Sequence, residues 1–560
     1  MNASTNLKAR FYHPLTVFVL YAVLTLVLYY PTRYAGFTSD FTGWQENFET
    51  QGVAGIPRAF DYHGLHHVFL AIYYTLYRLF HIRGIPWYLL FALFHALNAA
   101  LMYRLFRHLF ARLEIPSGRQ VALMGTLFFL VNPFQAEVLV WKTCLHYLMA
   151  LFFLLTVLWE EVRYLESGQV RHLYIAHLVF FVSLFSLELS YVTPLFSLAL
   201  VLFVHSTYVA KALRQSLVRV VAPQFVLLAL FFGLNKLVLG EIVGHYGTER
   251  HLLLKPTDFL AGIYRYTLKY VTFGRFWDFH KEMKMYDFVS QPVFVWPVTA
   301  LLVVLFVRFL LTWQQRKART QVAWFLAAGW VIGLLPVANL FFTVLLLGNN
   351  DRYGYYASGF LLTLFALGLY GIRYRPLRNA LLSAWLITNV VLQQRLAYIW
   401  RVNGVLHDEL LANFDFPPDE NILILSLPDD NNGLLLFRMY SSTGVLVDDL
   451  RYHSGKVHRG EIRAVAMYNV MDLGDGVQVI ARDSTTLEVF FKQWGNWWWM
   501  ETLGAPRQME NDLFKFKLIP GGYRLTFKRP PDEYTLIYQD GLEWQVVPWP
   551  PTGKYLDAAR

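Results

Sequence analysis

Polar and aromatic residues that can take part in chemistry stand beside long apolar segments of this sequence. The eight that we single out are Asp40, His63, Glu137, Trp141, Lys142, Glu188, Arg352 and Tyr353. Carboxylates can take up a proton or orient hydroxyl groups, and arginine and lysine can hold a phosphate. Ionisable residues beside a bilayer are costly and usually serve a site. We therefore expect a polar site at one face of a membrane.

Each of these residues also has a simpler interpretation. Asp40 alone suits a solvated loop carboxylate, and Arg352 suits an arginine that reaches the membrane interface. Glu137 and Lys142 lie close enough in the chain to pair with each other. His63 belongs to a small histidine cluster, which forms a metal site only where a convergent ligand set exists. Spatial convergence is what separates a site from these alternatives.

The elements that position these residues are apolar blocks. Of the 560 residues 56% are hydrophobic and only 16% are charged, whereas a soluble chain has about a quarter charged residues. A helix needs about 20 apolar residues to cross a bilayer. We predict an α-helical polytopic membrane protein with about eleven transmembrane helices. They lie near residues 14–31, 85–107, 119–135, 138–158, 172–189, 193–210, 220–239, 292–312, 321–346, 355–371 and 376–394.

Positive charge predicts the orientation of these helices. The formal charge of +10 comes from Lys and Arg in alternate short loops, which places the N-terminus inside and, with an odd helix count, the C-terminus outside. The same clustering speaks against nucleic acid as a partner. The first apolar segment has no cleavage pattern, so we expect a retained helix. Cys144 is the single cysteine and forms no intramolecular disulfide.

Two long outer loops, 32–84 and 240–291, interrupt the helices. Each contains an aromatic, amphipathic stretch, Val68–Phe80 in the first and Tyr264–Phe279 in the second. Such stretches are typical of helices that lie in the membrane interface. A short additional transmembrane helix at 66–80 is the alternative.

The C-terminal part changes in composition. The apolar run 421–427 predicts a buried strand, and alternation in 514–518 and 523–527 predicts two further strands. We therefore predict two domains, a multipass domain over 1–395 and a small β-rich, extracytoplasmic domain over 396–560.

Seven fragments follow one another in an order that carries a resemblance. They are Phe37–Phe41 with Asp40, Tyr62–Leu65, His95–Asn98, Asn132–Trp141, Ser186–Glu188, Leu335–Asn339 and Asp351–Tyr353. Together they resemble the C-type (GT-C) glycosyltransferases, which take sugars from polyprenyl-phosphate carriers. The pattern is most similar to the protein O-mannosyltransferase-like branch, including the transmembrane mannosyltransferases with tetratricopeptide repeats. The resemblance covers roughly residues 10–395, and the repeats are absent.

The resemblance implies an inverting hexosyl- or mannosyltransferase-like enzyme that moves a sugar to an acceptor hydroxyl on a protein or glycan. Asp40 would be the general base, and Arg352 and Lys142 would bind the donor phosphate. The residues that would orient the sugar or the acceptor are Glu137, Glu188, His63, Trp141 and Tyr353. No cofactor is required, no residue is assigned to a metal, and a divalent metal stays open.

This sequence departs from the family pattern at several positions, two of which lie in the turn before the fourth helix. Asn132 and Gln135 replace two histidines, Phe41 replaces an acidic residue that often follows the loop aspartate, and Leu187 replaces a lysine. The donor sugar is therefore not predicted.

Other functions fit the same topology. A lipid-linked glycan transporter or flippase, an O-antigen ligase or polymerase type of enzyme, and a non-catalytic membrane assembly protein are the alternatives. Transporters tend to carry polar groups near the midplane, whereas the residues here gather at one face. The outer domain has no Asn-x-Ser/Thr site, which favours a bacterial inner membrane with a periplasmic C-terminal domain. The expected partners are a polyprenyl-phosphate sugar, the bilayer and a protein or glycan acceptor.

Overall fold

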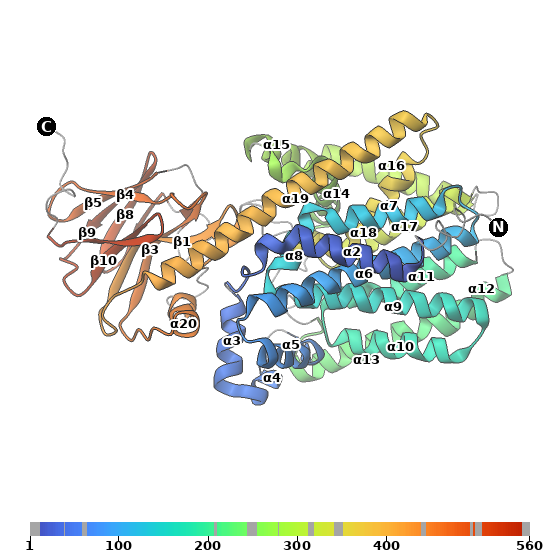
Figure 1. Cartoon of the computed structure of the whole chain (residues 1–560), viewed down its shortest axis with the longest axis horizontal. Helices are drawn as coiled ribbons and strands as arrows, with labels where there is room; N and C mark the ends of the chain where they lie inside the picture. The colour runs from blue at the N-terminus through green and yellow to red at the C-terminus, as the bar shows by residue number, and fades with distance from the viewer. Residues whose placement is uncertain are drawn as a thin grey trace. The chain divides into compact units, whose positions relative to one another are not determined.

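The computed structural model is mostly helical and ends in a β-rich region, as the sequence predicts (Figure 1). It describes residues 12–38, 40–58, 64–205, 210–243, 255–277, 279–311, 318–340, 351–437, 444–492, 497–498 and 507–550. Two compact units form, and each is described by itself. The first contains the described residues of 1–33, 53–341 and 350–396, and the second contains those of 34–52 and 397–560.

The first unit is built from helices. The long ones are α2 (Pro14–Tyr29), α5 (His67–Phe80), α6 (Gly84–Arg112), α7 (Gly118–Val131), α9 (Leu145–Ser167), α10 (Val170–Leu184), α11 (Thr193–Val204), α13 (Ala222–Leu239), α14 (Pro256–Thr272), α15 (Phe279–Ser290), α16 (Pro292–Leu311), α17 (Ala318–Leu334), α18 (Asp351–Leu369) and α19 (Arg375–Ala412), the last of which continues into the second unit. Short helices connect them: η1 (Tyr30–Thr32), η2 (Gly52–Ala54), α4 (Gly55–Arg58), η3 (Pro133–Gln135), α8 (Ala136–Val140), η4 (Lys142–Cys144), η5 (Glu188–Val192), α12 (Ala210–Ser216), η6 (Leu217–Val221), η8 (Gly274–Phe276) and η10 (Ala338–Leu340).

Within the described residues, four helical segments are long and apolar enough to cross a membrane. They are Pro14–Thr32, Gly84–Arg112, Lys142–Ser167 and Lys211–Leu239. Counting two bent pairs as single spans gives up to six; these are Gly118–Val131 with Pro133–Val140, and Lys281–Ser290 with Pro292–Arg308. Helices such as α10, with 15 residues, and α11, with 12, are short for a span. The count of about eleven therefore stays a prediction.

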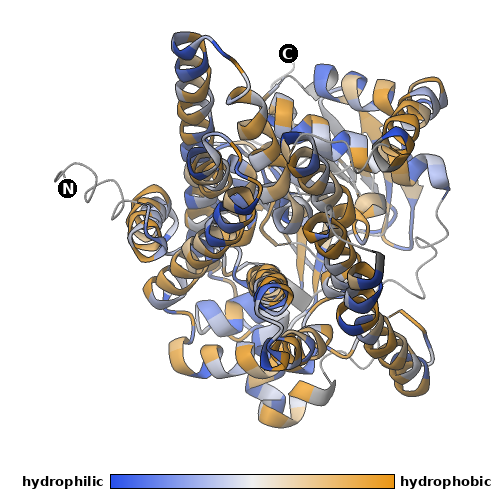
Figure 2. Cartoon of the chain, turned by 90° about the vertical axis from the view of Figure 1, so that its right-hand side faces the viewer, coloured by the Kyte–Doolittle hydropathy of each residue, from blue (hydrophilic) through white to orange (hydrophobic). Residues whose placement is uncertain are grey.

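Hydrophobic residues predominate along these helices, as the orange parts of the ribbon in Figure 2 show. On α2 the exposed residues Leu15, Val19, Val23 and Val27 recur at every fourth position, so they form one stripe along the helix. A stripe of this kind also occurs on α13, and on α16 the exposed apolar residues run consecutively from Leu301 to Val307. These surfaces are compatible with a membrane protein.

The second unit contains two sheets and two packed helices. Its strands are β1 (Ile422–Asn431), β2 (Leu434–Leu435), β3 (Ile462–Val470), β4 (Val477–Ala481), β5 (Thr486–Phe491), β6 (Trp497–Trp498), β7 (Gln508–Glu510), β8 (Phe514–Ile519), β9 (Gly522–Phe527), β10 (Thr535–Asp540) and β11 (Glu543–Val547). The first sheet has the order β11-β10-β1-β3-β6, with β2 paired to β1, and the second has the order β4-β5-β9-β8-β7.

Strand β1 lies at the centre of the first sheet, parallel to both β3 and β10. All ten of its residues are buried, as expected for a parallel strand covered on both faces. Helix α20 (Gly444–His453) connects β1 to β3. In β8 the alternation Phe514-Lys-Phe-Lys buries the phenylalanines and exposes the lysines, which confirms the predicted period of two.

One helix from early in the chain belongs to this second unit. Helix α3 (Asp40–Gln51) packs against α20, and its Phe41 and Phe48 are each 1% exposed. The sequence analysis placed this segment in the first outer loop of the multipass domain. Its apolar face instead finds its partner about 400 residues later in the chain.

Candidate functional site

The centre of the candidate site is a buried ion pair in the first unit. The Oε1 atom of Glu137 lies 2.5 Å from Nη1 of Arg352, and its Oε2 accepts the backbone N–H of Arg352 at 2.7 Å. The Glu137 side chain is 3% exposed and that of Arg352 is 18% exposed. One carboxylate thus holds both the side chain and the backbone of the arginine, 215 positions away in the sequence.

The break between α7 and α8 and the first turn of α18 bring these residues together. Helix α7 ends at Val131, and the Asn132 side chain accepts the N–H of Phe134 at 3.1 Å, which caps the short turn before α8. Glu137 follows in the first turn of α8, and Arg352 is the second residue of α18. A helix N-terminus offers unsatisfied N–H groups and a positive dipole end. The Glu137 carboxylate accepts the backbone N–H of Arg352 and so satisfies one of these groups at the start of α18.

Aromatic rings enclose the guanidinium of Arg352. Its central carbon lies 4.5 Å from the ring centre of Tyr353 and 5.2 Å from that of Trp141, distances typical of cation–π contacts. Nη2 also donates to the Tyr353 hydroxyl at 3.0 Å. The structure therefore brings Glu137, Trp141, Arg352 and Tyr353 together, as the sequence analysis expected of residues at one site.

A second set of buried charges begins at the neighbouring residue. Asp351 pairs with Lys269, at 2.5 Å from Nζ to Oδ1, and with Arg275. Their side chains are at most 6% exposed. A further acid, Glu282 of α15, is 1% exposed and lies within electrostatic range of both cations. Positive and negative charges thus alternate through the cluster.

Lys269 and Arg275 were not identified as site residues from the sequence. Both fall in the stretch 264–279, which the sequence analysis assigned to an interfacial helix. The signal that could have found them is the presence of three cations, Arg265, Lys269 and Arg275, in one aromatic segment of a long loop. Their partner, Asp351, is recognisable only once α14 and α18 are placed side by side.

The other predicted phosphate ligand, Lys142, is 1% exposed and lies in η4. Its Nζ lies 5.3 Å from the ring centre of Phe91. The structure pairs Glu137 with Arg352, and a pairing of Glu137 with Lys142 stays a prediction. A role of Lys142 in phosphate binding stays a prediction.

Glu188 belongs to a polar branch that reaches the same arginine. Its carboxylate lies 3.1 Å from Nε2 of His66. His146 is within electrostatic range of His66, Glu188 and Arg352. The His146 ring packs 4.6 Å from that of Tyr147. His66 and Glu188 thus form a second polar contact, separate from the pair of Glu137 and Arg352.

Two predicted site residues lie elsewhere. His63 is outside the described residues. Asp40 is exposed at the first position of α3, which belongs to the second unit. The role of Asp40 as a base therefore stays a prediction.

The remaining motif residues make structural contacts within the first unit. His95 contacts the Tyr355 hydroxyl at 2.9 Å and the Leu130 carbonyl at 3.2 Å. Asn98 donates to the Leu148 carbonyl at 2.9 Å. Asn132 and Gln135, in the turn before α8, donate to Asn389 and Ser358, respectively, both at 3.0 Å.

The part of the chain that the structure describes contains no group of three or more His, Cys, Asp or Glu residues that could hold a metal ion. Cys144 is buried.

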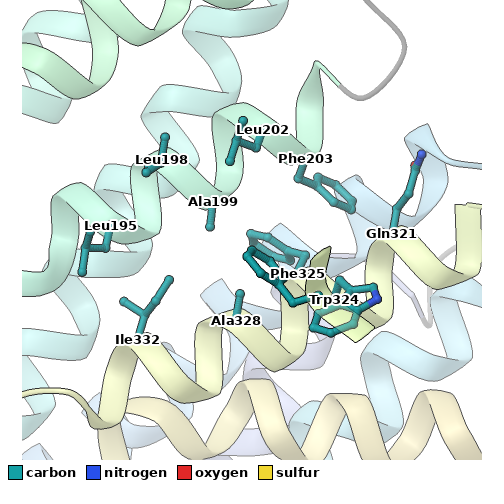
Figure 3. A pocket seen from close by; sticks show the side chains of 11 residues that line it. Leu195, Leu198, Ala199, Leu202, Phe203, Gln321, Trp324, Phe325, Ala328 and Ile332 are labelled. Atoms are coloured by element: carbon teal, nitrogen blue, oxygen red, sulfur yellow. The ribbon is translucent and has the colours of Figure 1, made fainter. Parts of the chain in front are cut away.

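An apolar cavity of about 210 Å³ opens between α11 and α17 (Figure 3). Its lining residues include Leu195, Phe203, Trp324, Phe325 and Ile332. The helices that form it reach α18 near the ion pair. The ring of Phe196 lies 5.9 Å from that of Tyr356, one helical turn after Arg352. Helix α11, which contributes part of the lining, thus also packs against α18.

No model of a known protein family and no curated protein matches this sequence.

Proposed function

We propose that this protein is a membrane glycosyltransferase of the GT-C type, which moves a sugar from a polyprenyl-phosphate donor to an acceptor hydroxyl. The observation that carries the proposal is the buried ion pair of Glu137 and Arg352 at the start of α18. A guanidinium that is held in place before the ligand arrives gives up little freedom on binding a phosphate. Arg352 is also the most accessible cation of the cluster.

In this proposal the donor phosphate binds at Arg352, and Lys142 adds positive charge. The acceptor oxygen attacks the anomeric carbon while the bond from that carbon to the phosphate oxygen breaks. Asp40 takes the proton of the acceptor hydroxyl, and the lipid phosphate leaves with its bonding electron pair. Charge develops on that phosphate as it leaves, so fixed cations stabilise the transition state.

The sugar is oriented by the acidic and aromatic groups around the arginine. The residues proposed for this role are Glu137, Glu188, Trp141, Tyr353 and His63. Aromatic rings offer apolar faces to a sugar, and carboxylates accept hydrogen bonds from its hydroxyls. No metal or other cofactor is part of the proposal.

The isoprenoid tail of the donor is assigned to the apolar cavity between α11 and α17. Its lining is almost wholly hydrocarbon, from Leu195 at one end to Phe203 at the other. Phe196, next to the lining residue Leu195 in α11, contacts Tyr356 of α18. A phosphate at Arg352 and a tail in the cavity would then belong to one molecule.

The exposed apolar stripes and long apolar helices support a multipass location in a membrane. We propose a bacterial inner membrane, with the β-rich unit in the periplasm and a protein or glycan as acceptor. The positive-inside distribution of Lys and Arg supports this orientation.

The test is sugar release from a labelled donor by purified protein in liposomes. A panel of polyprenyl-phosphate hexoses is supplied, and the label that leaves the lipid phase is counted. The variant is Arg352→Ala, and the matched control is Arg373→Ala, an exposed arginine after the other end of α18. We expect release by the wild type and by Arg373→Ala, with donor binding and release lost in Arg352→Ala. Unchanged donor affinity in Arg352→Ala would contradict the phosphate assignment, and no release by the wild type from any donor would contradict the function.

A further inference from the structure

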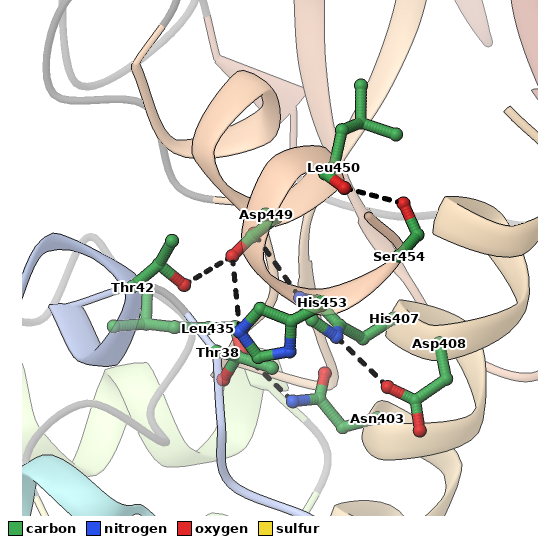
Figure 4. Close-up of polar contacts among 10 residues, drawn as sticks. All are labelled: Thr38, Thr42, Asn403, His407, Asp408, Leu435, Asp449, Leu450, His453 and Ser454. Carbon is green, nitrogen blue, oxygen red and sulfur yellow. Dashed lines mark hydrogen bonds and ion pairs between the residues drawn. The ribbon is translucent and has the colours of Figure 1, made fainter. Parts of the chain in front are cut away.

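Helix α3 is fixed to the rest of the second unit by a small set of buried polar contacts (Figure 4). Thr42 donates a hydrogen bond from Oγ1 to Oδ1 of Asp449 in α20. Just before the helix, Thr38 donates to the carbonyl oxygen of Leu435 at 3.1 Å. Asn403 of α19 donates to that same carbonyl at 2.9 Å. The segment that leads into α3 is thus tied to two other elements.

Asp449 is the centre of this arrangement. It is fully buried, and its Oδ2 lies 3.2 Å from Nε2 of His407 in α19. His407 is 1% exposed, and its Nδ1 lies 3.2 Å from the carboxylate of Asp408. A second histidine, His453, places its Nε2 3.9 Å from Asp449 Oδ1. One carboxylate therefore joins α3, α19 and α20.

Apolar contacts surround these polar groups. The ring of Phe41 lies 5.0 Å from that of Phe37 and 6.5 Å from that of His453, edge to face in both cases. The backbone at Gly404 approaches Ala35 so closely that a Cβ there would lie 3.2 Å from the Cβ of Ala35. A methyl group at this glycine would push the segment away from α19.

Electrostatics keep the ion pair formed at neutral pH. Burial alone would lower the pKa of His407, but the carboxylates of Asp449 and Asp408 outweigh burial and raise the pKa to about 9. Burial and the charge of His407 lower the pKa of His453 to about 4. At pH 7 the cluster therefore contains one protonated and one neutral histidine.

We propose that Asp449 and His407 are positioning residues, whose buried ion pair holds Thr42 and through it the first turn of α3. Asp40, the proposed general base, is the first residue of that turn, two positions before Thr42. The inference rests on the proposed function and adds to it a role for the second unit. The second unit would then set the position of the base, because α20 and the C-terminal part of α19, residues 397–412 with His407, belong to it.

The experiment compares three variants of the full chain. Asp449→Asn removes the charge, Thr42→Val removes the hydroxyl, and Thr42→Ser restores it. The matched control is Asp419→Asn, because Asp419 pairs with Arg459 in the same unit but is 73% exposed. Hydrogen exchange of the 40–51 amides reports the order of α3, and donor-dependent sugar release reports kcat and KM.

We expect Asp449→Asn and Thr42→Val to speed exchange in α3 roughly tenfold and to lower kcat by a similar factor, as for the loss of one hydrogen bond to a charged group. The donor KM should stay unchanged, because the variants leave the residues around Arg352 intact. Thr42→Ser and Asp419→Asn should behave as the wild type. Exchange in β8 and β9 should also be unchanged, which shows that the unit remains folded.

Two results would overturn the positioning role while leaving the proposed function standing. One is unchanged α3 exchange in both Asp449→Asn and Thr42→Val, and the other is faster α3 exchange with wild-type kcat. If the wild-type protein releases no sugar, the proposed function itself fails. That outcome is seen before any variant is compared, so the two failures are distinguishable.

Discussion

Breaking the pair of Glu137 and Arg352 should cost several kilocalories per mole of stability. Glu137 makes two contacts to the arginine, 2.5 Å to Nη1 and 2.7 Å to the backbone nitrogen. Glu137→Ala removes both and leaves a buried cation without its carboxylate. Removal of one partner of a buried ion pair costs about 3–5 kcal/mol. Glu137→Gln keeps one acceptor oxygen, so we expect about 1.5–3 kcal/mol for that variant.

The double variant Glu137→Leu with Arg352→Met distinguishes the stabilisation by the ion pair from the cost of burying its two charges. Replacing a whole buried ion pair with apolar residues of similar size is often neutral or stabilising. We therefore expect the double variant to be more stable than Glu137→Ala and to have lost sugar release.

The assay is unfolding by sodium dodecyl sulfate in mixed micelles, followed by tryptophan fluorescence, with Arg373→Ala as the control. A double-mutant cycle over the two positions should show coupling of at least about 2 kcal/mol. Additive costs, or a loss below about 1 kcal/mol in Glu137→Ala, would refute the reasoning, because the pair would then behave as a solvated surface contact.

Two further predictions concern pH and packing. His407 has a folded pKa of about 9 against an ordinary 6.5, so its contribution of about 3 kcal/mol is complete below pH 6.5 and is lost as pH rises through 9. His453 has a folded pKa of about 4, so stability also falls as pH drops from 6.5 towards 4. Scanning calorimetry should therefore place the maximum stability of the second unit near pH 6.5. A flat pH profile, or the same alkaline loss of stability in His407→Gln, would contradict this. Gly262→Ala should destabilise α14 by about 1–3 kcal/mol, because a Cβ at Gly262 would overlap the Ala338 carbonyl oxygen; denaturant unfolding tests it with Gly233→Ala, where the space is open, as control, and equal stability of the two variants would count against the packing.

Local sequence patterns predicted which segments form helices and strands better than they predicted which segments pack together. Alternation at Phe514–Leu518 predicted a strand, and the apolar run 421–427 predicted the buried centre of β1. These patterns arise because one or both faces of a strand are buried, and the type of each residue indicates whether its position is buried. The helical stretch at 68–80 is likewise visible in α5.

Contacts between distant segments were not predictable in the same way. The pairing of Glu137 with Arg352 spans 215 positions, and that of Thr42 with Asp449 spans 407. No local periodicity encodes such a partner. For the same reason the sequence around Asp351 does not identify Lys269 as its partner. The residue types alone indicated a polar site.

Helix α3 is the clearest example of a segment whose packing partner the sequence did not predict. Its sequence resembles a loop between membrane segments, and its position after the first apolar helix supported that interpretation. The helix groups with the second unit because Phe41, Phe48 and Thr42 find partners there. Only the folded second unit presents Asp449 to it.

The most direct test of the account is sugar release by Asp40→Asn. Asp40 is exposed at the start of α3, so this variant should fold and bind the polyprenyl-phosphate donor as the wild type does. Loss of a general base is expected to lower turnover by about 10²–10⁴-fold, with Asp419→Asn at wild-type turnover as the control. Turnover of Asp40→Asn equal to that of the wild type would contradict the account.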